Sequence, residues 1–321
     1  MDLLAYALIV AAFGFAFSMG AHYTGACMGM PYASGAIRAS WALVLMAPLT
    51  LLGAIFASGG VESTVGHGLL ANGTVSIGLA LGIVLSAFVL TSLYNLVTIP
   101  TSTIQIFVFA VVGAGLAQGI PIVWSTIGTL MVLWSIAPFV AFALGFLVVW
   151  LSDRAGRPNA RTSGLPQAAA LALVAVGTAA SFAMGANDVS NATGSFIMTG
   201  LFGPMTAGLI GGIGLAAGVL TWGRPLLQRV AFDIVRLDGR MATSAQFAQS
   251  VVILGYVAFG YFTSMNQALV GAMIGTGVAR GQKDIHFKAV RGILMGWAIG
   301  PASGAALGFA VSLLLAHLGW I

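Results

Sequence analysis

Residues 185–194 read Gly-Ala-Asn-Asp-Val-Ser-Asn-Ala-Thr-Gly, and apolar sequence flanks them on both sides. The carboxylate of Asp188 therefore stands at a depth where a membrane protein ordinarily carries no charge. Such a charge costs several kcal/mol unless a partner or a water-filled cavity offsets it, so its default interpretation is functional. The glycines at both ends predict a helix interruption. We expect this stretch to form a polar pocket cut into a membrane-spanning segment.

The composition places the chain among the α-helical membrane proteins. Of its 321 residues, 59% are hydrophobic and only 6% are charged, whereas about a quarter of an ordinary soluble domain is charged. The mean hydropathy is +1.03. Since no soluble fold of this size could bury so much apolar surface, we predict an all-α polytopic membrane protein surrounded by the lipid bilayer. No nucleic-acid partner is expected, because the basic residues lie in short loops.

Ten apolar stretches are predicted as membrane segments. They are 3–22, 40–58, 74–97, 104–120, 123–150, 166–186, 204–222, 244–262, 264–279 and 290–317. A full span needs about 20 residues. The fourth and ninth stretches are short and contain glycine, so we expect broken or re-entrant helices there.

The basic residues orient the chain. With an outside N-terminus and ten alternating segments, all of them fall on one side, which should be the cytoplasm. They are Arg38, Arg154, Arg157, Arg161, Arg224, Arg229, Arg236, Arg240, Arg280, Lys283, Lys288 and Arg291. Glu62 and His67 fall on the other side. The sequence thus predicts a multi-pass protein of the plasma membrane with cytoplasmic basic loops. A homodimer is compatible with it.

Two polar motifs recur at nearly the same spacing. Residues 20–29 align with residues 185–194 at an offset of 165, and residues 101–105 align with residues 263–267 at an offset of 162. Each half then carries five segments, and an odd number inverts the second half relative to the first. Many secondary transporters are built from such inverted repeats, with the site near the midplane at the repeat interface.

This repeat divides the chain into three parts. We predict a first inverted repeat over 1–150, a short cytoplasmic linker over 151–165 and a second inverted repeat over 166–321.

Four polar interruptions are expected to converge on one central site, at 20–29, 100–105, 185–194 and 262–267. Proline, serine and threonine at the second favour a helix N-terminus, whose unpaired N–H groups bind an anion without a fixed cation. No Lys or Arg lies in the first nine segments, so backbone N–H groups, hydroxyls and amides would hold the substrate. The substrate-binding candidates are Ser102, Thr103, Gln105, Ser264, Asn266, Gln267, Thr24 and Thr193.

Asp188 is predicted to couple transport to a cation. It cannot contact a fully charged anion unless it is protonated or neutralised. It would therefore take up a proton or share a Na⁺ with Asn187, Asn191 and backbone carbonyls, because such a cation prefers hard oxygen ligands. No cofactor other than this coupling Na⁺ or H⁺ is expected. His22 and Tyr23 occupy the positions of Asn187 and Asp188 in the first half.

Structural roles stay open as alternatives for these residues. Asp188 could cap a broken helix, and the hydroxyls could bond back to the preceding turn. The amides could join neighbouring helices. His22 could titrate near neutral pH or stay neutral.

Residues 185–192 resemble the signature of the inorganic phosphate transporter family, Gly-Ala/Phe-Asn-Asp-x-Ala-Asn-Ala, which those proteins carry in each of two inverted halves. A later Pro-x-Ser-Thr-Thr-His segment of that family resembles residues 100–105 and 262–267. The resemblance covers nearly the whole chain. It implies cation-coupled uptake of an inorganic oxyanion, with the Asn-Asp positions coordinating cation and substrate and the Ser-Thr segments adding oxyanion contacts.

The first half departs from that signature. His22, Tyr23 and Ala26 stand where Asn, Asp and Asn are expected, and glutamines at 105 and 267 replace histidines. The family's large central loop is reduced to a short linker. These features are more similar to the bacterial sulfate permease branch, which slightly favours sulfate over phosphate and fewer coupled cations than two.

The leading hypothesis is a symporter of a tetrahedral inorganic oxyanion, sulfate or phosphate. An anion channel of the same architecture is the alternative, although the acidic Asp188 would repel permeating anions. An enzyme is not expected, because the sequence contains no His-Glu-x-x-His motif, no Gly-x-Ser-x-Gly motif and no paired aspartates within the spans.

Overall fold

The computed structural model describes residues 2–71, 74–96, 101–154, 167–228, 237–282 and 287–321. Within these residues the secondary structure consists of α-helices joined by short connections. The helices are α1 (Leu3–His22), α2 (Thr24–Ala33), α3 (Ala39–Phe56), α4 (Gly59–His67), α5 (Ile77–Leu96), α6 (Thr103–Ala117), α7 (Trp124–Arg154), α8 (Gln167–Met198), α9 (Pro204–Gln228), α10 (Gly239–Ala258), α11 (Met265–Ala279) and α12 (Phe287–His317).

The chain is a multi-pass membrane protein. Among the described residues, eight helical segments are long and apolar enough to cross a membrane: α1 continued by α2, then α3, α5, α7, α8, α9, α10 and α12. Eight of the ten predicted stretches fall on these segments. The two stretches predicted to be short, now α6 and α11, are helices of only 15 residues each. The helices α2 and α4 lie where we expected polar connections.

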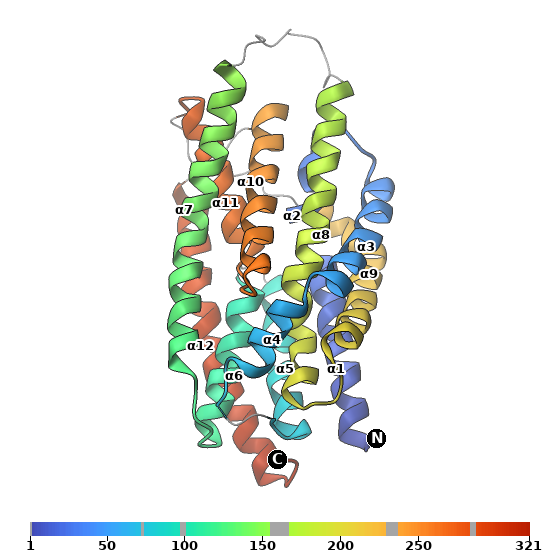
Figure 1. Ribbon diagram of the computed structural model, residues 1–321, viewed down its shortest axis with the longest axis vertical. Coiled ribbons are helices and arrows are strands. Elements are labelled where there is room, and N and C mark those ends of the chain that lie inside the picture. The colour runs from blue at the N-terminus through green and yellow to red at the C-terminus, as the bar shows by residue number, and fades with distance from the viewer. Residues whose placement is uncertain (1, 72–73, 97–100, 155–166, 229–236, 283–286) are drawn as a thin grey trace.

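Each short helix forms a re-entrant hairpin with the helix before it. Arg280, which follows α11, pairs with Asp238, which caps the start of α10, at 3.4 Å. The end of α11 therefore returns to the end of the molecule where α10 began. In the same way, Gln118 after α6 bonds to Ser312 of α12, and Gly82 near the start of α5 packs on Leu315 of α12. Figure 1 shows α6 in the lower half and α11 in the upper half.

The two halves run in opposite directions, as predicted. In Figure 1, α1 and α7 rise from the lower end, whereas α8 and α12 descend from the upper end. Equivalent helices of the two halves also make equivalent packing contacts. α6 packs on α12 as α11 packs on α7, and α1 packs on α9 as α8 packs on α3.

Close backbone contacts confirm the inverted repeat at the residue level. A Cβ added at Gly20 would overlap the carbonyl oxygen of Leu215, and a Cβ added at Gly185 would overlap that of Thr50. Gly185 follows Gly20 by 165 residues and Leu215 follows Thr50 by 165 residues, which is the offset of the sequence motif. Only glycine lets the helices approach this closely, so the crossing of α1 on α9 and that of α8 on α3 are equivalent.

Residues 185–194 do not interrupt their helix, contrary to our prediction. α8 runs unbroken through them. Both glycines serve close packing instead, because Gly185 lies against the backbone of Thr50 and Gly194 lies against the side chain of Val65. In the first half, the equivalent segment is divided at Tyr23, where α1 ends and α2 begins.

The linker lies mostly outside the described residues. α7 continues to Arg154 and so includes the first four residues of the segment predicted at 151–165. The basic residues Arg157, Arg161, Arg229, Arg236 and Lys283 also lie outside the described residues. Among the described ones, Arg240 and Arg280 both pair with Asp153 near the end of α7, at 3.5 and 2.6 Å. These helix ends lie at the upper end in Figure 1.

Candidate functional site

The Asn187 side chain binds the turn that leads into α11. Its Nδ2 donates to the carbonyl oxygen of Thr263 at 2.8 Å, and its Oδ1 accepts from the N–H of Thr263 at 3.0 Å. The same Nδ2 also donates to Oδ2 of Asp188 at 3.1 Å. All three residues are fully buried. Asn187 therefore ties the start of a re-entrant helix to α8 and holds one oxygen of the membrane carboxylate.

Three buried oxygens around this contact have no hydrogen-bond partner among the described residues. They are Oδ1 of Asp188, Oδ1 of Asn191 and Oγ1 of Thr263. Asp188 and Asn191 are three positions apart on α8, so their side chains are neighbours on one face. The Asn191 amide nitrogen makes only a long contact with Sδ of Met19, at 3.8 Å. A buried oxygen without a donor is costly, and a small cation or a proton removes that cost.

Tyr23 brings the first repeat into the same cluster. Its hydroxyl lies 2.7 Å from Oγ1 of Thr103, the first residue of α6. The phenol and the Asp188 carboxyl are also close enough to interact. Tyr23 is fully buried. The residue that replaces an aspartate in the first half thus stands beside the remaining aspartate and contacts the other re-entrant helix.

Both re-entrant helices start in the interior with a serine cap. Ser102 accepts from the N–H of Gln105 at 3.5 Å, and Ser264 accepts from the N–H of Gln267 at 3.4 Å. The N–H groups of the first helical turn have no acceptor within their own helix. Because α6 and α11 run in opposite directions away from the middle, their positive ends face one another there. The two polar segments therefore form helix N-termini in the interior, as predicted.

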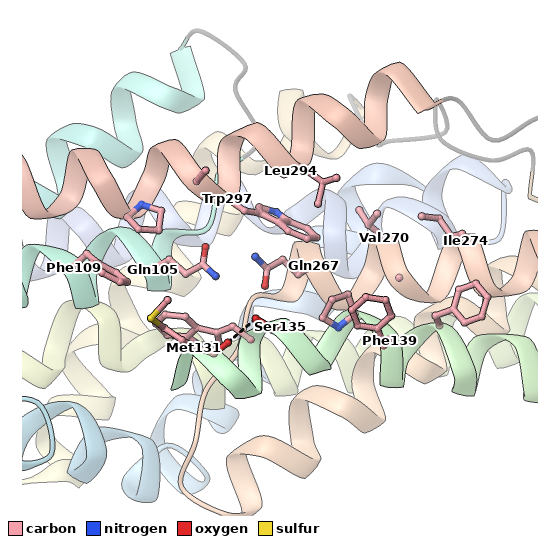
Figure 2. A pocket seen from close by; sticks show the side chains of 16 residues that line it. Gln105, Phe109, Met131, Ser135, Phe139, Gln267, Val270, Ile274, Leu294 and Trp297 are labelled. Carbon is pink, nitrogen blue, oxygen red and sulfur yellow. Dashed lines mark hydrogen bonds between the residues drawn. The ribbon is translucent and has the colours of Figure 1, made fainter. Parts of the chain in front are cut away.

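Gln105 and Gln267 line a separate pocket of about 890 Å³ between α6, α7, α11 and α12. Figure 2 shows the two amide groups pointing toward one another across it. The rest of the lining is mostly apolar and includes Trp134 and Trp297. Oε1 of each glutamine is buried without a partner among the described residues. The two halves therefore supply equivalent amides to one cavity.

We expected every candidate to lie at one cavity, but the structure does not bring them all together. Thr103 faces Tyr23, whereas Gln105 lines the pocket on the far side of α6. Residues two positions apart on an α-helix point about 200° apart, so both cannot face the same space. The buried cluster at Asp188 and the glutamine pocket are two sites, joined through the first turns of the re-entrant helices.

His22 lies near the start of α11. Its Nε2 is 3.4 Å from Nδ2 of Asn266, and its ring meets that of Tyr23 edge to face at 4.8 Å between centroids. Asn187, its counterpart in the second half, holds Thr263 instead. His22 therefore reaches across to the second repeat.

Two threonine candidates lie away from the Asp188 cluster. Thr24 bonds to the carbonyl oxygens of Ala21 and Gly223, at 3.0 and 2.9 Å, and so fastens α2 to α9. Thr193 lies 2.8 Å from Oε1 of Glu62 on α4. Neither hydroxyl faces the start of a re-entrant helix in this conformation.

Sequence reasoning missed three buried polar residues. Glu62 was assigned to an outer connection, yet it is fully buried. Gln246 and Gln249 on α10 were not considered. Gln246 binds the carbonyl oxygen of Ala26 at 2.9 Å and also Gln249, which binds that of Met265 at 3.2 Å. Amides three positions apart in an apolar segment would have been a signal for this link between α2 and α11.

The cluster can hold a cation only through mixed oxygen ligands. Among the described residues, no group of three or more His, Cys, Asp or Glu side chains could bind a metal ion. The partnerless oxygens of Asp188, Asn191 and Thr263 fit a monovalent cation with hard ligands better than a transition metal.

Comparison with known proteins gives one consistent result. A model of the phosphate transporter family matches residues 19–170 and 156–308. The chain is 29% identical over 307 residues to the sulfate permease CysP of Bacillus subtilis (strain 168), covering 95% of this chain and 85% of that protein. It is 26% identical over 351 residues to a probable low-affinity inorganic phosphate transporter of Mycobacterium tuberculosis (strain ATCC 25618 / H37Rv), covering 98% and 82%.

The fold also matches a solved structure, described as the sodium-dependent phosphate transporter. The TM-score is 0.86 at 20% sequence identity, and the match covers 98% of this chain and 100% of that chain.

Proposed function

Because this chain belongs to the phosphate transporter family, we propose that it imports an inorganic oxyanion together with a coupling cation. The family and the relatives described above are transporters, so the chain is a transporter and not an enzyme. The coupling, the substrate and the transport mode are inferred from the arrangement of the two buried sites.

The pair of facing helix starts is the observation that carries this proposal. α6 and α11 both begin in the interior, capped by Ser102 and Ser264. Their free N–H groups and positive dipole ends attract an anion without a lysine or arginine. A tetrahedral oxyanion offers several acceptor oxygens and can bridge the two ends. Thr103 adds a hydroxyl to this space.

The coupling cation binds at Asp188 in this proposal. Oδ1 of Asp188 and Oδ1 of Asn191 are its ligands, with Oγ1 of Thr263 as the third. Asn187 positions Asp188 and Thr263 through its hydrogen bonds. The cation neutralises the carboxylate before the anion arrives, because an uncompensated negative charge beside the site would repel the substrate. The same oxygens accept a proton if H⁺ rather than Na⁺ is the coupling ion.

Sulfate is the better substrate on chemical grounds. Phosphate near neutral pH carries hydroxyl groups that need acceptors, whereas sulfate needs only donors. Helix N-termini supply donors alone. Tyr23 stands where the family signature has a second carboxylate, so one strong acceptor is lost. The similarity to a sulfate permease supports this preference.

A carrier accounts for the burial of the cluster better than a channel does. Asp188, Thr103 and Ser264 are each at most 1% exposed. A channel needs a continuous open path, whereas a carrier passes through states in which the site is closed to both sides.

Uptake into proteoliposomes tests the proposal. Radiolabelled sulfate or phosphate is supplied outside, with an inward gradient of Na⁺, of H⁺ or of neither. We expect one of these gradients to drive sulfate above its external concentration, and unlabelled sulfate to compete better than phosphate. Uptake that only equilibrates, whatever the gradient, would support the channel and reject symport.

Location and assembly follow as proposals from the charge distribution and the sequence. The helix ends with arginines would face the cytoplasm of a plasma-membrane protein. The homodimer stays a prediction.

A further inference from the structure

Glu62 is a second carboxyl group buried in the transporter. It lies on α4, which is not one of the segments long and apolar enough to cross a membrane. Its side chain is 0% exposed, and its hydrogen-bond partner among the described residues is Thr193 of α8. Its Oε2 has no partner among the described residues. The proposed transport mechanism leaves this carboxyl group without a role.

The hydrogen bonds around Thr193 need one more proton than a carboxylate provides. Oγ1 of Thr193 lies 2.8 Å from Oε1 of Glu62 and 2.9 Å from the carbonyl oxygen of Val189. A threonine hydroxyl has a single hydrogen to donate. If Glu62 is ionised, two acceptors compete for that hydrogen. If Glu62 is protonated, it donates to Thr193, Thr193 donates to Val189, and both contacts are satisfied.

In the part of the chain that the structure describes, no positive charge faces this carboxyl group. Besides Glu62, the ionisable residues of α4 and of the elements packed on it are His67 on α4, Asp188 on α8, Arg224 on α9, Arg240 and Tyr256 on α10, and Tyr261 in the following turn.

The two arginines lie far along their helices from α4. α9 touches the α3–α4 junction at Gly208, and Gly60 of α4 touches Gly260 beyond the end of α10. At 1.5 Å per residue, Arg224 and Arg240 are roughly 24 and 30 Å from those points. The Tyr256 hydroxyl donates to Leu133 on α7. His67 is exposed. No ion pair in the described part of the chain includes Glu62.

We propose that Glu62 is a proton-binding site of the transport cycle, where a proton neutralises the carboxylate and lets α4 seat against α8. Thr193 follows Asp188 by five residues, about 7.5 Å further along α8 toward the end where both termini lie. Glu62 therefore lies between Asp188 and that end of the molecule. In this proposal it closes the route that the substrate takes on that side of the coupling site. When α4 leaves α8 and water enters, the proton passes to water and a solvated carboxylate remains.

The titration of Glu62 agrees with this assignment. Burial raises the pKa of Glu62 to about 8, although the hydrogen bond with Thr193 lowers it. The group is then protonated at neutral pH and ionises on the alkaline side.

External pH tests the site in proteoliposomes, and this test rests on the proposed uptake of sulfate. Wild-type uptake should fall as the external pH rises through about 8, by roughly tenfold for each further unit if one group titrates. Glu62→Gln mimics the protonated form and should keep its neutral-pH uptake at alkaline pH. His67→Gln, the matched control on the same helix, should keep the wild-type profile. A Glu62→Gln profile that coincides with the wild-type profile would overturn the proposal.

Infrared spectroscopy of the purified protein tests the proton without any transport. A pH titration should show the carbonyl band of a protonated carboxylic acid that disappears at alkaline pH. The part of this band that titrates near pH 8 should be lost in Glu62→Gln and kept in Asp188→Asn. A band unchanged by Glu62→Gln would contradict the assignment. Should the wild-type protein take up no oxyanion, the proposed function fails, while this spectrum still decides whether Glu62 holds a proton.

Discussion

Two asparagines one turn apart on α8 have different tasks. Asn187 satisfies both the N–H and the carbonyl oxygen of Thr263, so it holds the start of α11 in place. Asn191 leaves its Oδ1 without a partner among the described residues. The first asparagine links two elements of the structure, and we propose the second as a ligand of the coupling cation.

Replacing each asparagine with leucine separates the two tasks. Asn187→Leu keeps the branched shape of the side chain but leaves a buried N–H and carbonyl unpaired, at a cost of about 1–3 kcal/mol each. We expect a clear loss of thermal stability in detergent. Asn191→Leu should melt near the wild-type temperature but require more coupling cation for half-maximal uptake. Equal stability losses in the two variants would refute this division.

The buried carboxyl of Glu62 makes stability depend on pH. Its folded-state pKa of about 8 exceeds the ordinary value of 4.5 for a glutamate, so between these values the folded protein binds a proton that the unfolded chain releases. Stability contributed by this group therefore falls as pH rises from about 4.5 to about 8. Glu62→Gln should melt several degrees above the wild type on the alkaline side, and the gap should shrink on acidification. A constant gap would show that Glu62 does not titrate in this range.

At the scale of the elements, glycine contacts decide how closely the helices approach. Gly20 on α1 meets the backbone of Leu215 on α9, and neither backbone can yield to a methyl group. Gly128 on α7 has open space around it. These two positions form a matched pair for one substitution.

Gly20→Ala should lower the melting temperature, because overpacking costs about 1–3 kcal/mol. Gly128→Ala should be neutral or slightly stabilising, since alanine is the better helix former. Thermal unfolding of both variants in detergent measures the difference. If Gly20→Ala is as stable as Gly128→Ala, the contact between α1 and α9 is looser than the structure shows.

Sequence reasoning found most of the elements and misjudged their continuity. Apolar stretches located every spanning helix, and Ser102 and Ser264 marked the starts of α6 and α11. The glycines at 185 and 194 suggested a break, but tertiary packing uses them for contact with Thr50 and Val65. Helices α2 and α4 escaped notice because polar residues and glycines interrupt them.

The sequence predicted which residues contribute to the site better than it predicted which of them lie together. Asn187, Asp188 and Tyr23 lie together, as the repeat implied. Thr103 and Gln105 were assigned to one site, yet helical periodicity turns them to opposite sides of α6. The burial of Glu62 could not be foreseen, since it depends on α4 folding back against α8.

At the scale of the whole molecule, the two inverted repeats are equivalent in their helix packing but differ in their polar side chains. The crossings of α1 on α9 and of α8 on α3 are equivalent. The polar residues are not, because His22 and Tyr23 stand where the second half has Asn187 and Asp188. We therefore propose that coupling is concentrated in the second half, while the first half supplies hydroxyls and shape.

Cysteine labelling tests the orientation of the protein in the membrane. Glu62 is buried, so the neighbouring exposed position His67 is the better probe. In intact cells, His67→Cys should react with an impermeant maleimide, whereas Arg154→Cys should react only after lysis. The native Cys27 is buried and should contribute little. The reverse pattern would place the arginine-bearing helix ends outside.

Concentrative sulfate uptake by Asp188→Asn tests the central claim most directly. The variant keeps the shape of the side chain but removes the charge that we propose binds the coupling cation. With the wild-type driving gradient imposed on proteoliposomes, we expect wild-type protein to accumulate sulfate above the external concentration and folded Asp188→Asn to lose this accumulation entirely. Accumulation by the variant to the wild-type level, with the same dependence on the cation, would contradict coupling at Asp188.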